Sequence, residues 1–362
     1  MTKFVKSKKF NIMKTLLKST REKRGLMLRE VAQQAGIDQA LISKFESGNR
    51  VPTKDQLAKL ARVLDLDLTE LTVLWLKERI LFEVGEDDDL ALKAMMLAEE
   101  EIKYRTKPVK AILPKAIKSL LTDIDKLKKK LDKIRQFDSY RIAQALELEY
   151  TFESNRIEGN TLTLKETDLV VNEGLTISGK SMREHLEAIN HKEAIGYVKH
   201  LIDKNTEINE REVLAIHNII LRGIDQINAG KYRNVQVMIK GSSFMPPAPY
   251  LVNPKMEEYY HWYDTNKKRI HPVILAAEMH ERLVTIHPFI DGNGRTSRLV
   301  MNLLLLKHGY VIANIKGDAK SRMSYYNALE KAQTTTDKSD FIELVAAYEL
   351  QALERYIQIL GK

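Results

Sequence analysis

HPFIDGNGRTSR, residues 287–298, lies between two apolar segments with helical spacing, residues 272–286 before it and residues 296–306 after it. This arrangement predicts a loop that leads directly into the first turn of a helix. The unpaired N–H groups of such a turn attract anions, and the two glycines let the backbone approach a phosphate without a Cβ in the way. We therefore expect a phosphate-binding loop here.

The charged residues of this stretch suit the chemistry of a nucleoside triphosphate. A carboxylate oxygen of Asp291 can hold Mg²⁺, and Arg295 and Arg298, three positions apart on one helix face, can each form a bidentate contact with phosphate oxygens. The ordinary pKa of a histidine lies near neutrality, so His287 can accept a proton from an attacking hydroxyl. A glycine-containing surface loop with flanking charges is the alternative interpretation.

The stretch resembles the signature of the Fic (filamentation induced by cAMP) family, HPFx[D/E]GNGRxxR, at every defined position. The resemblance implies transfer of AMP from ATP to a hydroxyl of a target protein, with pyrophosphate leaving. It assigns His287 as the general base and Asp291 as the Mg²⁺ ligand. It assigns phosphate binding to Gly292, Asn293, Gly294, Arg295 and Arg298. Relatives that transfer phosphate itself commonly carry lysine at the position of Gly294, which favours AMP transfer.

A second motif, Ser154-Asn-Arg-Ile-Glu158-Gly159, fits the pattern [S/T]xxxE[G/N], which resembles the self-inhibitory helix of Fic proteins. The resemblance places an inhibitory helix near residues 150–160 and pairs Glu158 with Arg298, which denies that arginine to the γ-phosphate. One guanidinium cannot serve a carboxylate and a phosphate at once. The alternative is that Glu158 is a solvated residue at the end of a helix.

Between the two motifs, Val235, Val237 and Ile239 occupy alternate positions and are followed by Gly241-Ser-Ser. Strict alternation before a glycine-serine turn predicts a short β-hairpin, and an exposed strand edge can bind an extended peptide. By the resemblance, Val237, Met238 and Ile239 form a flap that aligns the target backbone. A hairpin that merely covers the core is the alternative. The resemblance also assigns the adenine pocket to Tyr325, Tyr326 and Gln333.

Near the N-terminus, LREVAQQAGIDQALISKFESGNRVP (residues 28–52) has the spacing of a helix-turn-helix. Gly36 supplies a left-handed turn, Asp38 is a good N-cap for the second helix, and Gly48 ends that helix. The segment resembles an XRE/Cro-type repressor domain. That resemblance implies DNA binding as a homodimer, with these residues facing the major groove: Gln39, Ala40, Ser43 and Lys44.

Charge is distributed unevenly along the chain. Residues 1–80 contain 17 lysines and arginines against nine acidic residues, so this segment carries +8 of the total net charge of +9. A basic module of this kind is typical of nucleic-acid binding; a solvated basic tail is the alternative. The chain has no cysteine, which excludes thiol catalysis and disulfides and fits a cytoplasmic location. No apolar run approaches the roughly 20 residues of a membrane span, so we expect no membrane partner.

The sequence thus predicts a mainly α protein with a helix-turn-helix bundle in residues 1–80, a linker in residues 81–114 and a helical Fic domain with a short β-hairpin flap in residues 115–362. Three functional hypotheses follow. The first is an AMP-transferase that is restrained by Glu158 and tethered to a DNA-binding domain. The second is a transcription regulator whose Fic region senses nucleotide. The third is removal of AMP, or transfer of another phosphate-linked group, by the same residues.

Overall fold

The computed structural model describes residues 12–84, 88–105, 114–135, 140–239, 241–335 and 337–361. These residues form a helical protein, as predicted, and contain no β-strand. None of the helices in these ranges is both long and apolar enough to cross a membrane. The chain divides into two compact units, Met1–Pro108 and Val109–Lys362, each of which is considered by itself.

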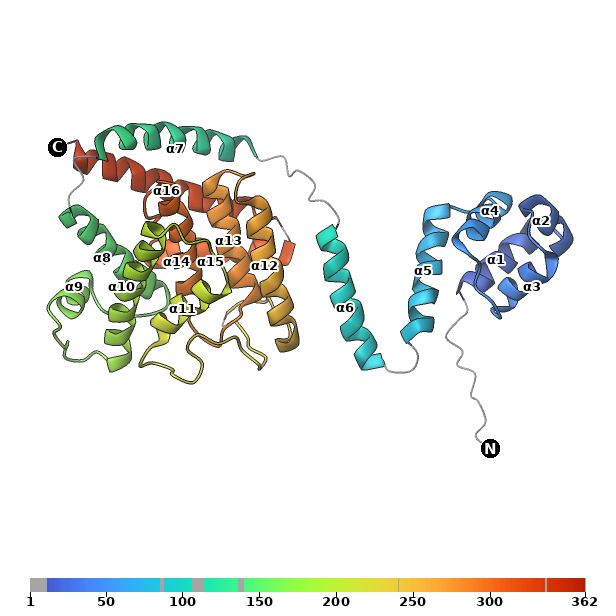
Figure 1. The fold of residues 1–362 in the computed structure, drawn as a ribbon, viewed down its shortest axis with the longest axis horizontal. Coiled ribbons are helices and arrows are strands. Elements are labelled where there is room, and N and C mark those ends of the chain that lie inside the picture. Colours follow the sequence, from blue (N-terminus) through green and yellow to red (C-terminus); the bar gives the residue numbers. More distant parts are fainter. Residues whose placement is uncertain are drawn as a thin grey trace. The chain divides into compact units, whose positions relative to one another are not determined.

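The first unit is helical, and all but the last of its described helices pack into a bundle (Figure 1). Its helices are α1 (Ile12–Lys23), α2 (Leu28–Ala35), α3 (Gln39–Ser47), α4 (Lys54–Leu64), α5 (Leu68–Val84) and α6 (Asp88–Arg105). The turn between α2 and α3 has the predicted chemistry, because Gly36 adopts a left-handed backbone (φ 61°) and the Asp38 carboxylate accepts hydrogen bonds from two N–H groups of α3. Val31 of α2 and Ile42 and Phe45 of α3 are buried between the helices of this unit.

The interval that the sequence predicts as a linker is largely helical. It contains the end of α5 and all of α6, while residues 85–87 and 106–113 lie outside the described residues. Helix α6 has no regular apolar stripe, and Leu90, Leu92 and Met96 on it are exposed. Periodicity therefore did not indicate this helix. Its high content of alanine, leucine, methionine, lysine and glutamate, which all have strong helix propensity, accounts for it.

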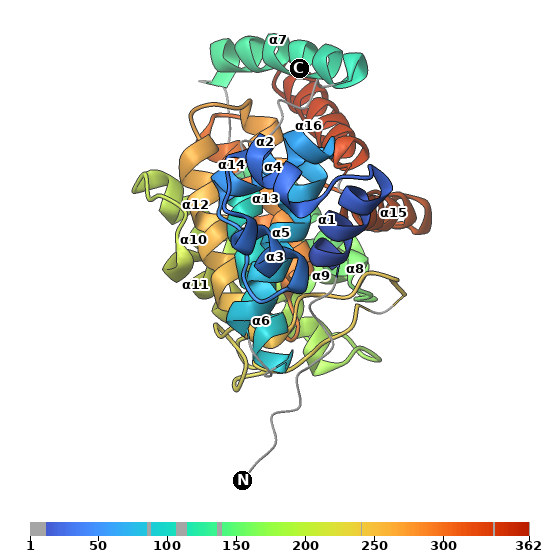
Figure 2. The same ribbon diagram turned by 90° about the vertical axis from the view of Figure 1, so that its right-hand side faces the viewer.

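The second unit is built around two consecutive buried helices. The full set is α7 (Lys115–Ile134), α8 (Tyr140–Ile157), α9 (Leu164–Asn172), α10 (Met182–Asp203), α11 (Glu210–Leu221), α12 (Val252–Asn266), α13 (Pro272–Ile286), α14 (Asn293–Lys307), α15 (Ala319–Thr335) and α16 (Ser339–Leu360). Helices α13 and α14 pack on each other, and most of their residues are buried on all sides. Helix α7 lies along α16 on the outside of the unit (Figures 1 and 2).

Residues 231–239 and 241–248, the described part of the predicted β-hairpin, form no strand, so that part of the fold prediction is wrong. The Arg233 guanidinium donates to the carbonyls of Val235 (3.0 Å) and Pro247 (2.6 Å), and the Gln236 amide donates to the carbonyl of Pro246 (3.0 Å). Side chains thus bond carbonyls on both arms of the expected hairpin. An isolated two-stranded hairpin is at best marginally stable, which explains why alternation alone did not produce paired strands. Within the resulting loop, exposure differs among the predicted flap residues: Met238 is exposed, whereas Val237 and Ile239 are partly buried.

One acidic residue lies inside the core of the second unit. Glu349 on α16 is fully buried, and its Oε1 accepts a hydrogen bond from the Val311 N–H at 3.1 Å. Within the described part of the chain, Oε2 has no hydrogen-bond partner. Burial raises the pKa of Glu349 well above its usual value of 4.5. The folded protein therefore holds this proton more tightly than the unfolded chain does.

This proton makes stability depend on pH. The stabilisation from a carboxyl group whose pKa is raised on folding is fully present below the pKa of the unfolded chain. As pH rises from that value to the pKa of the folded protein, the free energy of unfolding falls by about 1.4 kcal/mol per pH unit. Glutamine has the shape of the protonated carboxyl and carries no charge. We expect Glu349→Gln to raise Tm more at pH 8 than at pH 5.5, by about 2–4 °C for each kcal/mol gained. Calorimetry would measure this, with Glu354→Gln on the exposed face of α16 as control; an equal shift at both pH values would contradict it.

Candidate active site

His287 stands at the end of α13, where the chain turns sharply. Its backbone is left-handed (φ 51°), which is rare for a residue other than glycine and directs the chain into the next loop. Its Nδ1 lies 3.2 Å from the carbonyl oxygen of Val284. Because a carbonyl only accepts, Nδ1 carries the proton and Nε2 keeps its lone pair. Burial lowers the pKa of His287 below 6.5, so the ring is neutral at pH 7 and suited to act as a base.

The loop after His287 is closed by Asn293. Its side-chain Oδ1 accepts from the Phe289 N–H at 3.0 Å, and its Nδ2 donates to the Phe289 carbonyl at 2.9 Å. The Asn293 side chain is therefore engaged within the loop itself. Gly292 (φ 79°) precedes α14 and provides no side-chain cap, so no side chain covers the first N–H groups of this helix. A helix end of this kind attracts anions, and phosphate binding at this one stays a prediction.

Arg298 is almost completely buried and is held by the end of α8. Its Nη2 donates to Glu158 Oε1 at 2.7 Å and to the Ser154 carbonyl at 2.8 Å, and its Nε donates to Ser154 Oγ at 3.0 Å. Burial alone would lower the pKa of Arg298, but the adjacent Glu158 outweighs it and raises that pKa above its usual value. Ser154 and Glu158 of one motif are thus in direct contact with Arg298 of the other, although the two motifs lie about 140 positions apart.

Gly294 leaves the space that the Glu158 carboxylate occupies. A Cβ built on Gly294 would collide with Oε1 of Glu158 and would lie 3.1 Å from Nη1 of Arg298. The absence of a side chain at position 294 is therefore a steric condition for the contact between Glu158 and Arg298. Gly159 adopts φ 98° directly after Glu158, a backbone that favours glycine and turns the chain away from the site.

Asp291 is already bonded to several donors. One carboxylate oxygen, Oδ2, forms an ion pair with Arg183 of α10. The other oxygen, Oδ1, accepts from the Gly292 N–H at 2.6 Å and lies 3.4 Å from Nη2 of Arg295. Burial would raise the pKa of Asp291, but Arg295, the Gly292 N–H and Arg183 together lower it. The sequence analysis did not identify Arg183, because nothing in the sequence indicates a contact between residues 108 positions apart.

A second carboxylate, Glu187, joins this group to the end of the inhibitory segment. Its Oε1 lies 3.2 Å from Arg183 Nε and 3.4 Å from Arg295 Nη1. Its Oε2 accepts from Asn160 Nδ2 at 3.0 Å. Asn160 follows the turn that ends the inhibitory motif, so Glu187 links that turn to the signature loop.

The residues fit a phosphate and a Mg²⁺ ion. Arg295 is 2% exposed, and its Nε has no hydrogen-bond partner within the described ranges. A buried donor without an acceptor is the arrangement expected where phosphate oxygens bind. In these ranges no three metal-binding side chains cluster together. Mg²⁺ commonly uses one or two carboxylates together with water and substrate phosphates, so Asp291 alone is a sufficient protein ligand.

Two further residues position the loop, and the sequence analysis did not assign them this role. The Arg233 backbone N–H donates to the Pro288 carbonyl at 2.8 Å, and its Nε donates to the His287 carbonyl at 2.7 Å. The ring of His217 stacks on Phe289 at 3.6 Å, and its Nε2 lies 2.9 Å from the Asp291 carbonyl. Burial lowers the pKa of His217 to about 4, so this ring stays neutral. Arg233 thus connects the candidate target loop with the signature loop, and His217 connects α11 with it.

The residues that the resemblance assigns to adenine lie on α15. Tyr325 is buried, with its hydroxyl 3.4 Å from Arg298 Nη1 and 3.2 Å from His280 Nε2. The Tyr326 hydroxyl donates to the Ile157 carbonyl at 3.0 Å, beside the inhibitory motif. Gln333 is partly buried seven positions after Tyr326, on the same face of the helix. Their role in adenine binding stays a prediction.

The candidate DNA contacts share the outward face of α3. The four side chains are all exposed: Gln39, Ala40, Ser43 and Lys44. On the opposite face, Ile42 and Phe45 are buried in the core of the first unit. This geometry leaves the predicted recognition residues accessible.

Part of each unit matches a known protein family. Residues 207–305 match the Fic/DOC family, and residues 17–71 match the helix-turn-helix family. Protein adenylyltransferase Fic of Nematostella vectensis is 34% identical over 241 residues, which cover 65% of this chain and 55% of the relative. Protein adenylyltransferase Fic of Drosophila grimshawi is 36% identical over 210 residues, which cover 58% of this chain and 42% of the relative. The chain thus spans about half the length of these curated relatives.

Solved structures show the same fold. Fic-1 (residues 134–508) from C. elegans has a TM-score of 0.61 and 23% identity, covering 96% of this chain and 98% of its own. A Fic domain-containing signaling protein from Bacteroides thetaiotaomicron has a TM-score of 0.60 and 26% identity, covering 66% and 98%. The chain therefore carries a Fic/DOC-family domain together with a helix-turn-helix domain.

Proposed function

We propose that the second unit is a protein adenylyltransferase that moves AMP from ATP to a serine, threonine or tyrosine hydroxyl of a target protein or of itself. The observation that carries this proposal is the pairing of buried Arg298 with Glu158 and Ser154 beside a loop that presents His287. The name protein adenylyltransferase Fic, borne by relatives at 34% and 36% identity, supports the same reaction.

The reaction requires one proton acceptor and several phosphate-binding groups. Nε2 of His287 takes the proton of the target hydroxyl while its oxygen attacks the α-phosphorus. A new oxygen–phosphorus bond forms, the bond from the α-phosphorus to the bridging oxygen breaks, and pyrophosphate leaves. Arg295 and the first N–H groups of α14 hold the phosphates. Mg²⁺, held by Asp291, neutralises phosphate charge when bound.

The target backbone lies along the loop that contains Val237, Met238 and Ile239. Arg233 fixes the start of this loop against the carbonyl of His287, which sets the distance between the target hydroxyl and the base. Tyr326 and Gln333 contact the adenine. In the resting protein Glu158 holds Arg298, so the γ-phosphate lacks this arginine until the pair separates.

Removing the Glu158 carboxylate should release this inhibition. A charge-assisted contact contributes about 1.5–3 kcal/mol, so we expect Glu158→Gly to raise AMP transfer roughly ten- to a hundredfold. Incorporation of labelled AMP into the protein itself and into cell extract measures the effect. Glu173→Gly, at an exposed position after α9, is the matched control.

The proposed mechanism requires that the rise in AMP transfer of Glu158→Gly depend on His287 as the base. Adding His287→Ala to Glu158→Gly should abolish the labelling while DNA binding persists. Labelling that does not change in Glu158→Gly would reject autoinhibition. If wild type and Glu158→Gly both fail to label, but nucleotide alters DNA affinity, the unit is a nucleotide sensor rather than an enzyme.

Arg183 should compete with Mg²⁺, because both occupy the Asp291 carboxylate. We expect Arg183→Ala, in the Glu158→Gly background, to lower the Mg²⁺ concentration for half-maximal labelling several-fold, since a charge-assisted contact no longer has to break. Mn²⁺ binding with ATP, followed by electron paramagnetic resonance, should tighten in parallel. Arg211→Ala, at an exposed position of α11, is the control. Weaker Mn²⁺ binding would mean that Arg183 only orients Asp291.

We also propose that the first unit binds DNA as a homodimer in the cytoplasm, with α3 in the major groove. Binding to the chain's own promoter region should weaken steeply between 50 and 200 mM salt, as phosphate contacts dictate, by about 10³ or more if six or more phosphates are contacted. Fluorescence anisotropy measures this. Lys44→Ala should weaken binding, whereas Lys59→Ala on α4, where the lysine pairs with Asp55, should not. If the Lys44→Ala variant bound DNA with the affinity of the wild type, α3 would not lie at the DNA interface.

A further inference from the structure

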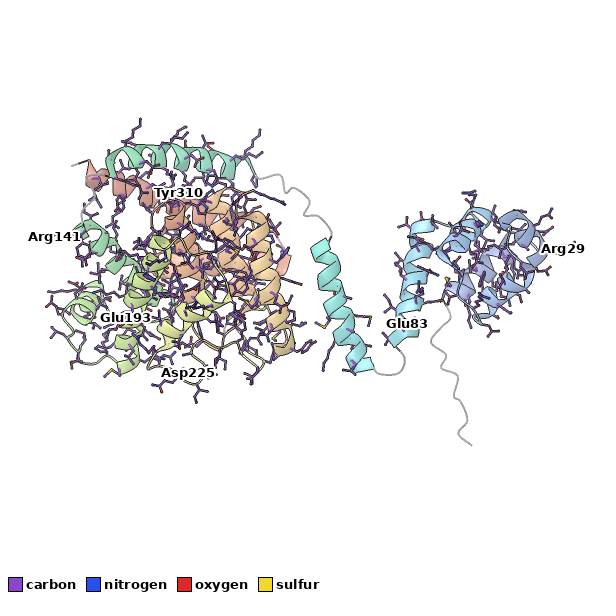
Figure 3. All side chains as sticks on the ribbon, viewed as in Figure 1. Arg29, Glu83, Arg141, Glu193, Asp225 and Tyr310 are labelled. Carbon is purple, nitrogen blue, oxygen red and sulfur yellow. The ribbon has the colours of Figure 1, made fainter. Side chains whose placement is uncertain are left out.

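The outer face of α7 carries a row of lysines that the proposed reaction does not use. The lysine row consists of six exposed residues: Lys115, Lys118, Lys126, Lys129, Lys130 and Lys133. At about 100° per residue, all six fall within about a third of the helix circumference. The opposite face packs on α16 and contains the buried residues Ile117, Leu121, Ile124 and Leu131. In Figure 3, long side chains project from α7 away from the rest of the unit, whereas Tyr310 lies beneath this helix.

The charge of α7 differs from that of the chain around it. Residues 115–135 contain eight lysines and arginines against three acidic residues, a net charge of +5. The rest of residues 81–362 contains 33 basic against 37 acidic residues, a net charge of −4. The positive face of α7 is therefore a local feature and does not follow from the composition of the second unit.

Most of the lysine row has no carboxylate to pair with. Within the described residues, Lys126 is the one member of the row in an ion pair, at 2.9 Å from an aspartate of α7. The other two carboxylates of this helix bond elsewhere. Asp125 accepts from the Tyr310 hydroxyl at 2.9 Å, and Asp132 pairs at 2.8 Å with Lys128, which is not in the row. Five lysines thus keep their charge available for a partner.

The lysine row is unfavourable for the helix that carries it. Lys126 and Lys130 are like charges four positions apart, and so are Lys129 and Lys133; such pairs destabilise a helix. Lys115 begins α7, and no acidic residue lies in its first turn, so positive charge meets the positive end of the helix dipole. A face that serves solubility alone usually mixes both signs of charge. Anions bound along the row would remove these costs.

The length of the row favours an extended polyanion. Lys115 and Lys133 are 18 positions apart, which corresponds to about 27 Å of helix, or the axial length of about eight base pairs of DNA. Lysine binds a phosphate as a point charge and does not read bases in this role. Because the same chain carries a helix-turn-helix family domain, the polyanion that fits best is double-stranded DNA.

We propose that the lysine row of α7 is a second, sequence-independent contact with the phosphates of double-stranded DNA. Sequence choice stays with α3, whereas the row adds affinity on any sequence, and two DNA-binding modules in one chain raise each other's occupancy. None of the residues assigned to the candidate active site lies on α7, so the row binds DNA without occupying that site. The choice of DNA rests on the proposed function of the first unit, whereas the row itself is a feature of the second unit alone.

The salt dependence of binding tests the row on the full chain. Each neutralised phosphate contributes about 0.9 to the slope of log affinity against log salt concentration. Glutamine removes the charge and keeps the helix propensity of lysine. The row variant combines Lys118→Gln, Lys129→Gln, Lys130→Gln and Lys133→Gln. With a random-sequence DNA duplex and fluorescence anisotropy, we expect its slope to be shallower by about 2–4 and its affinity to fall about tenfold or more.

A matched control removes the same charge from other places on the second unit. It combines changes at four exposed lysines outside α7: Lys165→Gln, Lys204→Gln, Lys268→Gln and Lys320→Gln. Its slope should stay close to that of the wild type, because net charge alone adds no phosphate contact. An unchanged slope of the row variant, or equal losses in the row variant and the control, would overturn the proposal.

The Lys44→Ala background separates the row from the first unit. There the four changes in α7 should reduce the slope by the same amount, because distant contacts add. If Lys44→Ala leaves DNA binding intact while the row variant weakens it, the proposal for α3 fails and the row stands. If the row variant loses affinity for vesicles rich in phosphatidylserine and none for DNA, the row faces a membrane and the DNA proposal fails.

Thermal unfolding checks that the row is not needed for folding. The Tm of the row variant should equal or exceed that of the wild type, since the changes remove repulsion between like charges. A lower Tm would mean that these lysines stabilise the fold, which would overturn the argument for a DNA contact.

Discussion

The structure of the second unit depends on the charge of Arg298. A guanidinium that is 1% exposed has lost its hydration, and an unpaired buried charge is strongly destabilising. Glu158 and two oxygens of Ser154 replace the lost water. A triphosphate offers the same replacement. In the proposed function the protein therefore has two ways to satisfy one arginine, and because they exclude each other, this arginine alone would account for both a resting and an active state.

The charges of the site resemble the pattern that the proposed substrate complex would have. The carboxylate of Glu158 lies on Arg298, where a phosphate would place its negative charge, and the guanidinium of Arg183 lies on Asp291, where a metal ion would place its positive charge. Each group that is to bind a charged ligand is thus kept neutralised. Since Glu187 contacts both Arg183 and Arg295 and bonds Asn160, these substitutes belong to one connected group. Displacing either Glu158 from Arg298 or Arg183 from Asp291 therefore weakens the contacts that hold the other pair.

Features formed by residues that are neighbours in the sequence were predicted, whereas contacts between distant segments had no signal in the sequence pattern. The helix-turn-helix and the loop of residues 287–298 were found because every residue with a role lies at a fixed offset from its neighbours. The contact of Glu158 with Arg298 came from family resemblance, since no pattern in one sequence links such distant positions. Arg183, His217 and Arg233 act through long-range contacts and had no local signal. The β-hairpin failed because alternation predicts strands only where a partner strand completes the hydrogen bonds, and Arg233 and Gln236 bond the carbonyls of this loop instead.

Helix α8 connects these observations. Its second half is buried and carries Ser154, and Glu158 follows it directly, so separation from Arg298 cannot occur through the glutamate side chain alone if the Ser154 contacts are also to break. The Ser154 carbonyl belongs to the helix backbone, which means that the helix itself has to shift. Its first half is only partly buried and is held mainly by the ion pairs of Glu147 and Glu149 with α10 and α16. Surface ion pairs of this kind contribute little individually, about 0–1 kcal/mol. The first half of α8 is therefore where a small input of binding energy can decide whether the buried end stays on Arg298.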